Sequence, residues 1–231
     1  MIPFLSKALY HHALRSYRRC VMSVCLLLAC CAPLQAQSLT EIWRAMPDSI
    51  VPYLNHDQRA EMPSYASMHV DGTIDNQLGG KSRMDTLTAD FTEVKLNEAT
   101  TLQMKLLPIV NRDTVVCLVT TWTSGDNGES KIQFFTPQWQ PLPVQRFLGV
   151  SSLQDFADQL TIRPDHLSTT EYEKLKAMID PVMVEASLHA ESDELSLRLS
   201  LPLLSKEDKE KVKAILASAQ LKWSNGKFVG R

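Results

Sequence analysis

A run of nine residues near the middle of the chain limits most strongly what this sequence can fold into. Residues 114–122, TVVCLVTTW, contain no glycine, proline or charge. The run is shorter than the roughly 20 residues that a membrane-spanning helix needs, and β-branched side chains favour a pleated sheet. A strand that is apolar on both faces is covered on both faces. We therefore expect residues 114–123 to form the central strand of the domain.

The segments around this run alternate between apolar and polar residues, as strands with one solvated face do. Leu102, Met104 and Leu106 point to one face, whereas Gln103 and Lys105 point to the solvated face. Short polar connections between successive strands indicate an antiparallel meander. Its strands are expected at residues 90–96, 100–109, 114–123 and 131–136.

The clearest hairpin lies near the C-terminus, with strands expected at residues 182–190 and 195–201. In the expected register, Leu188 lies opposite Leu197. A slip of one residue would pair apolar with polar side chains throughout, so the pattern specifies which residues face the core. This core face consists of Val184, Ala186, Leu188, Leu195, Leu197, Leu199 and Leu201.

Capping boxes mark the starts of three expected helices, because a serine hydroxyl and a carboxylate three residues later satisfy backbone N–H groups of the first turn. These pairs are Ser38 with Glu41, Ser152 with Asp155 and Ser168 with Glu171. Two more helices are expected at residues 55–68, kinked or interrupted by Pro63, and at residues 205–219. A short strand at residues 221–223 closes the chain, and the weakly periodic residues 69–90 are expected to form a loop.

These elements predict an α+β fold. We expect a single domain with a mainly antiparallel sheet, in which the central meander and the C-terminal hairpin form one sheet that amphipathic helices cover.

Residues 1–36 have the order of regions found in a signal peptide. A basic region without acidic residues comes first, an apolar run extends from Val21 to Ala32, and Leu34-Gln35-Ala36 resembles a signal-peptidase site. The apolar run is too short for a stable transmembrane anchor. We expect cleavage after Ala36, which leaves residues 37–231 as the single domain. In the alternative, residues 27–30 form a lipobox and Cys30 carries a lipid.

Cleavage at this point would change the charge and the cysteine content of the chain. Residues 37–231 keep 20 of the 24 Lys and Arg residues and all 26 Asp and Glu residues, a formal net charge of −6. A mildly acidic domain lacks the basic footprint of a nucleic-acid binder. Cys117 is the one cysteine left, so the domain has no internal disulfide and must be stabilised by its core.

Candidate catalytic residues are few in this sequence. His69, Asp71 and Asp75 lie together in the expected loop, and they are the trio to test if the protein is an enzyme. Cys117 is expected to be buried and unreactive within the central strand. Because no pair of histidines has a metal-binding spacing, no metal or cofactor is expected. We therefore predict no catalytic centre.

The tryptophans give one candidate for a contact with a partner. Trp139 lies in the proline-flanked segment PQWQP and is the best candidate among the tryptophans for an exposed aromatic ring. Trp43 lies on the apolar stripe of its helix and Trp122 at the end of the central strand, so both are expected in the core.

Five short segments together resemble a family of small exported proteins of unknown function from Gram-negative anaerobes. They are MPDS at residues 46–49, PYL at 52–54, LGGKS at 78–82, MKLLP at 104–108 and FFTPQWQPL at 134–142. The order and spacing of the segments carry the resemblance, which covers nearly all of residues 37–231. It implies export and a single domain, and it brings no catalytic residues.

The sequence predicts an exported envelope protein, in the periplasm or outside the cell, that binds a partner protein or a surface ligand without catalysis. One alternative is a hydrolase that acts on an envelope polymer through the histidine and carboxylates of residues 69–90. A purely structural subunit is another. No nucleic-acid partner and no stable transmembrane anchor are expected, and no motif identifies the partner.

Processing can be tested directly on the protein recovered from cells. Mass spectrometry of the mature N-terminus should find a chain that begins at Gln37, because the small residue Ala36 ends the cleavage site. A chain that begins at an acylated Cys30 would establish the lipoprotein alternative instead.

Overall fold

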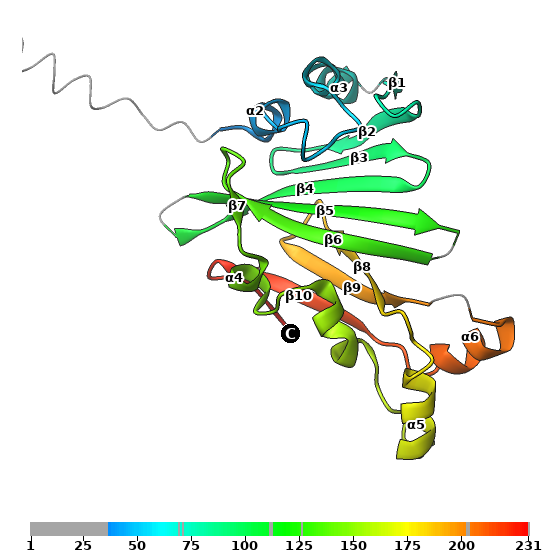
Figure 1. The fold of residues 1–231 in the computed structure, drawn as a ribbon. Helices are drawn as coiled ribbons and strands as arrows, with labels where there is room; N and C mark the ends of the chain where they lie inside the picture. Colours follow the sequence, from blue (N-terminus) through cyan, green and yellow to red (C-terminus); the bar gives the residue numbers. More distant parts are fainter. Residues whose placement is uncertain are drawn as a thin grey trace, which may run out of the picture. The chain divides into compact units, whose positions relative to one another are not determined.

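The computed structural model describes residues 37–230 except residues 69, 71, 111–112, 126 and 202–203 (Figure 1). Residues 37–231 form one compact unit. Its elements are, in chain order, helices α2 (Leu39–Arg44) and α3 (His56–Met68), strands β1 (Ile74–Asp75), β2 (Lys81–Leu87), β3 (Phe91–Asn97), β4 (Thr100–Pro108), β5 (Thr114–Ser124), β6 (Asn127–Phe135) and β7 (Pro141–Leu142), helix α4 (Val144–Leu148), the 3-10 helix η2 (Leu153–Leu160), helix α5 (Thr169–Lys176), strands β8 (Met183–Leu188) and β9 (Glu194–Ser200), helix α6 (Lys206–Lys213), and strands β10 (Ser218–Ser224) and β11 (Lys227–Gly230).

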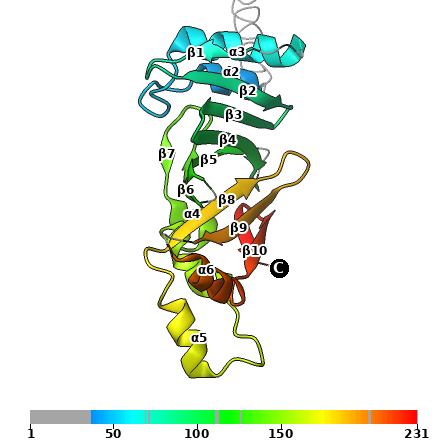
Figure 2. The same ribbon diagram turned by 90° about the vertical axis from the view of Figure 1, so that its right-hand side faces the viewer.

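The strands form two antiparallel sheets in a single α+β domain, which confirms the predicted fold class. Strands β1 to β7 follow one another in a seven-stranded meander, and β8 to β11 form a four-stranded sheet in the order β11-β10-β9-β8. The expectation of one sheet shared by the meander and the hairpin is wrong in this detail. The hairpin packs its apolar face against the meander, which buries more side chains than pairing along an edge would (Figure 2).

Strand β5 is the buried centre of the structure, as its sequence predicts. Val115 to Val119 are all buried, and successive side chains point into different cores. Val115, Cys117 and Val119 belong to the core between the two sheets. Val116 and Leu118 belong to a second core beneath α2 and α3. Because both faces of β5 are apolar, one layer packs against each face of the sheet.

The N-terminal helices close the second core. Helix α2 begins at the predicted capping box, in which Ser38 and Glu41 bond to each other's backbone N–H groups. These hydrogen bonds lower the pKa of the Glu41 carboxyl from its ordinary value. Helix α3 continues through Pro63 without interruption. The buried Arg59 ties α3 to the preceding connector, because its guanidinium donates to the Leu54 carbonyl and, at 2.7 Å, to the Asp48 carboxylate.

The hairpin of β8 and β9 has the predicted core face but a different register. Leu188 pairs with Leu195 and Ala186 with Leu197, whereas the sequence suggested Leu188 opposite Leu197. A shift of two residues keeps apolar opposite apolar, so the hydrophobic pattern does not distinguish the two registers. The loop between the two strands is held from outside, since the main-chain N–H of Trp223 donates to the Asp193 carbonyl at 2.8 Å.

The segment expected to be a loop, residues 69–90, contains strands β1 and β2 instead. Strand β2 buries Ser82 and Met84 and exposes the charged residues between and beside them. The alternation is hard to see in the sequence because one inward residue is polar. The Ser82 hydroxyl is satisfied inside the sheet, where it donates to the Leu96 carbonyl at 2.6 Å.

Other differences lie at the ends of elements. Strand β6 begins at Asn127 rather than Lys131, because the β5–β6 turn is tighter than the sequence suggested. Ala219 belongs to β10 rather than to the last helix, and β11 follows as an additional strand. Helix α4 was not predicted.

Polar side chains of the meander attach the second sheet at its edge strand, β8. The Ala186 N–H donates to Ser130 Oγ and the Leu188 N–H donates to Gln103 Oε1, both at 2.9 Å. Lys105 is 1% exposed, and its Nζ donates to the carbonyls of residues 189 and 190 at 3.0 and 3.2 Å. Gln103 and Lys105 were expected on a solvated face, and this face is covered because the second sheet lies over it.

The buried ammonium of Lys105 should contribute measurably to stability. Its Nζ also lies 3.1 Å from Asp90 Oδ2 and 3.6 Å from Asp193 Oδ1. Lys105→Met leaves two main-chain carbonyls without their donor and should lower the free energy of unfolding by about 1–3 kcal/mol. The matched change Lys95→Met on the exposed face of β3 should have an effect below about 0.5 kcal/mol. Equal effects in chemical denaturation would show that Lys105 does not join the sheets.

Candidate functional site

Strand β6 has one side that is only partly paired. Along its whole length it pairs with β5. On the other side, β7 covers only its last two residues, with Phe134 opposite Leu142 and Phe135 opposite Pro141. In the part of the chain that the structure describes, no strand is hydrogen-bonded through its main chain to the rest of this edge.

The hydrogen bonds show which main-chain groups of β6 point outward. The Thr136 N–H donates to the Gln140 carbonyl at 2.9 Å, and the Gly128 N–H donates to Ser200 Oγ at 2.8 Å. Both bonds lie on the side away from β5. Because main-chain groups alternate along a strand, Ser130 and Ile132 point the same way. None of the described residues pairs with their outward N–H and C=O groups.

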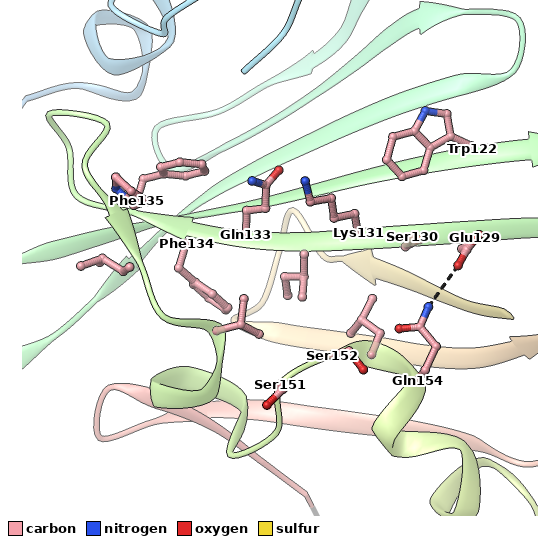
Figure 3. Close-up of a pocket in the computed structure, with 15 residues that line it drawn as sticks. Trp122, Glu129, Ser130, Lys131, Gln133, Phe134, Phe135, Ser151, Ser152 and Gln154 are labelled. Carbon is pink, nitrogen blue, oxygen red and sulfur yellow. Dashed lines mark hydrogen bonds between the residues drawn. The ribbon is translucent and has the colours of Figure 1, made fainter. Parts of the chain in front are cut away.

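A groove of about 540 Å³ lies along this edge (Figure 3). Its apolar surface comes from Ile132, Phe134, Leu142, Val144 and Leu153. Figure 3 shows Gln133 and Lys131 on one side of β6 and Phe134 on the other. At one end, Gln154 Nε2 donates to Glu129 Oε1 at 3.1 Å and joins the two walls of the groove.

The groove has β6 on one side and residues 151–154 on the other, and these residues are positioned by the end of α4 and the start of η2. Helix α4 is followed by Gly149, whose φ of 75° turns the chain sharply and suits glycine. The Asp155 carboxylate then accepts from the N–H groups of Ser151 and Ser152 at 3.0 and 2.9 Å. These bonds hold both serines at the rim of the groove. The predicted pairing of Ser152 with Asp155 thus fixes part of the site.

Of the trio proposed from the sequence, the structure describes Asp75, which does not line the groove. His69 and Asp71 lie outside the described residues. Asp75 is at the end of β1, where its side chain is 88% exposed and accepts from Lys81 Nζ at 3.0 Å. The adjoining glycines form a plain turn, in which Asn76 Oδ1 accepts from the N–H groups of residues 78 and 80.

The prediction that Trp139 is exposed is wrong. Trp139 is 6% exposed, and its Nε1 donates to the Ile42 carbonyl at 3.0 Å. Its ring packs against Phe135 with 5.3 Å between the centroids. Trp122, which was expected in the core, is 44% exposed at the far end of the groove. The proline-flanked segment suggested a surface loop, but the indole N–H finds its partner inside.

Metal-binding groups do not gather in the described part of the chain, where no three His, Cys, Asp or Glu side chains could hold one ion. Within the same residues, no helix is long and apolar enough to cross a membrane. Cys117 is fully buried in β5, and this burial raises the pKa of its thiol. Such a thiol is a poor nucleophile.

Thiol labelling tests the placement of Cys117. A thiol-specific reagent should modify the protein only after denaturation, because the reactive thiolate is disfavoured and the sulfur is enclosed. Fast labelling of the native protein would mean that β5 is not the buried central strand.

Comparisons with known proteins identify the family and the fold. The family model described as "Protein of unknown function (DUF3256)" matches residues 31–228. The solved structure of a domain of an uncharacterized protein from Porphyromonas gingivalis W83 is similar, with a TM-score of 0.69 and 24% sequence identity, and the match covers 84% of this chain and 97% of that one. At this identity the likeness shows the fold. Curated proteins give no match. Since the family model covers most of the chain, the protein belongs to the DUF3256 family of proteins of unknown function.

Proposed function

We propose that this protein is an exported, non-enzymatic binding module that takes an extended segment of a partner polypeptide as an added strand along β6. The observation that carries the proposal is the outward main chain of Ser130 and Ile132, which no described residue pairs, at the side of a groove.

The chemistry of this edge suits a polypeptide main chain better than another ligand. Outward N–H and C=O groups recur every second residue, and an extended peptide presents the complementary groups at the same spacing. Addition of a strand to a sheet edge is a common mode of peptide recognition, in which main-chain bonds give affinity and pockets select side chains. Leu142 and Val144, which line the groove and are only partly buried, offer apolar surface for alternate side chains of the added strand.

The length of the open edge limits the size of the bound segment. It extends from Gly128, whose N–H already bonds to Ser200, to Phe134, which pairs with β7. At about 3.3 Å per residue, this edge accommodates roughly three to five residues of an extended chain. The groove of about 540 Å³ is consistent with a segment of this size.

Sequence features support the cellular setting of the proposal. Residues 1–36 have the organisation of a signal peptide, which indicates export to the periplasm or beyond. The net charge of −6 for residues 37–231 disfavours nucleic acid as the partner. A polypeptide of the cell envelope fits both features, either a soluble protein or an exposed segment of a membrane protein.

The experiment begins with a display library of random peptides selected on the purified protein. Enriched peptides should lose binding when amides that face β6 are N-methylated, and the loss should recur at every second residue. N-methylation of the intervening amides should have little effect, since those groups point away from the sheet. The proposal would be contradicted if N-methylation weakened peptide binding without recurring at every second residue. It would also be contradicted if the library yielded no binder.

A pair of substitutions tests the same edge from the side of the protein. Ile132→Pro removes the outward N–H and places a ring in the path of the added strand, and it also removes a side chain from the core between the sheets. It should weaken peptide binding by about tenfold or more. The matched change Ile132→Ala loses a comparable side chain but keeps the N–H, so it should retain the main-chain bond.

Thermal unfolding of both variants shows whether they are folded. Equal binding by folded Ile132→Pro and Ile132→Ala would contradict strand addition. The protein could instead form a dimer that Ile132→Pro abolishes, without binding any peptide. The occupant of the edge would then be a second copy of the chain, and the proposal would be wrong.

A further inference from the structure

A second cavity, of about 510 Å³, adjoins the groove at the Gly128 end of β6 and shares Trp122 and Glu129 with it. We propose that this cavity receives a basic side chain, lysine or arginine, of the segment bound along β6. The inference rests on the proposed function and adds to it the residue type that the site selects.

An exposed indole forms one part of this cavity. Trp122 is 44% exposed, whereas the other three tryptophans are buried. It pairs with Glu129 across β5 and β6, and both residues line the cavity; Figure 3 shows the Glu129 carboxylate turned toward Gln154. A cation is attracted to the face of an indole, and more strongly when the site is partly desolvated. The combination of ring and carboxylate therefore favours a positively charged group.

The charged residues that line the cavity have one sign. Glu129 and Asp180 contribute carboxylates, and none of the described residues that line the cavity is lysine or arginine. The Glu129 carboxylate is held in place by the hydrogen bond from Gln154. An acidic side chain would meet two like charges here, and a neutral one would gain nothing from them.

Apolar residues complete the cavity in a way that suits a long side chain. Pro181, Met183 and Leu204 contribute apolar surface to it. Lysine and arginine bury their methylene stems against apolar surface while the charged end remains near polar groups. Strand β8 lies close to this end of β6, because a Cβ at Gly128 would overlap the Glu185 carboxylate.

The first experiment uses small probes, so that it does not depend on a bound peptide. N-acetyl-arginine amide should protect Trp122 from acrylamide quenching, and the neutral isostere N-acetyl-citrulline amide should protect it at least fivefold more weakly. Trp122 dominates this signal because it is the exposed tryptophan. Protection should weaken severalfold in Glu129→Gln and in Asp180→Asn. Glu98→Gln, an exposed change in the β3–β4 turn, should leave protection unchanged.

Equal protection by the two probes, or protection that both cavity variants retain, would overturn the inference. Since these variants keep side-chain size at exposed positions, they should remain folded, and circular dichroism checks this.

Peptides from the display selection separate this inference from the function on which it rests. Enriched peptides should carry Lys or Arg at one fixed position, and its replacement by norleucine should weaken binding about tenfold. Some peptides could lose binding on N-methylation at every second residue and yet carry no fixed Lys or Arg. Such peptides would support strand addition along β6 and refute the selection of a basic side chain. Protection of Trp122 by the arginine probe, together with no strand-like binding of peptides, would refute strand addition along β6 instead.

Discussion

Coverage of both faces of β5 is the constraint on which the rest of this structure depends. Val116 and Leu118 need an apolar layer on one side, and Val115, Cys117 and Val119 need another on the opposite side. The N-terminal helices supply the first layer and the four-stranded sheet supplies the second. Because β8 crosses the meander as an edge strand, its free N–H groups must be satisfied, and Ser130 and Gln103 accept from them. The second sheet is thus attached by polar contacts around an apolar core.

This arrangement leaves β6 as a strand whose outer side is closed at both ends and open between them. Proteins usually protect such edges, since unpaired main chain invites pairing with other chains. Here Ser200 satisfies Gly128, and β7 pairs with Phe134, so the open part is confined to Ser130 and Ile132. Lys131 on the exposed face is the kind of residue that discourages aggregation at an edge. A short, guarded opening is what selective recognition of one extended segment requires.

Patterns of hydrophobicity predicted the fold class and which face of each strand is buried. They could not predict which residues pair across strands or which distant groups a polar side chain contacts. The apolar run around Cys117 identified the central strand because only a covered strand tolerates it. The predicted hairpin register differs from the observed one by two residues, because the alternation of apolar and polar residues repeats every two residues. Lys105 appeared solvated because its partners come from a distant hairpin loop. The open edge at Ser130 and Ile132 depends on how far β7 extends, and no local pattern encodes that length.

The most direct measurement is amide hydrogen exchange of β6, residue by residue, by NMR. In the free protein, the amides of Ser130 and Ile132 should exchange faster than those of Glu129 and Lys131, which face β5. Addition of a peptide from the display selection should slow exchange at Ser130 and Ile132 and leave the other two amides nearly unchanged. Slow exchange at all four positions in the free protein, or no added protection with peptide bound, would contradict the account of β6 as a site for strand addition.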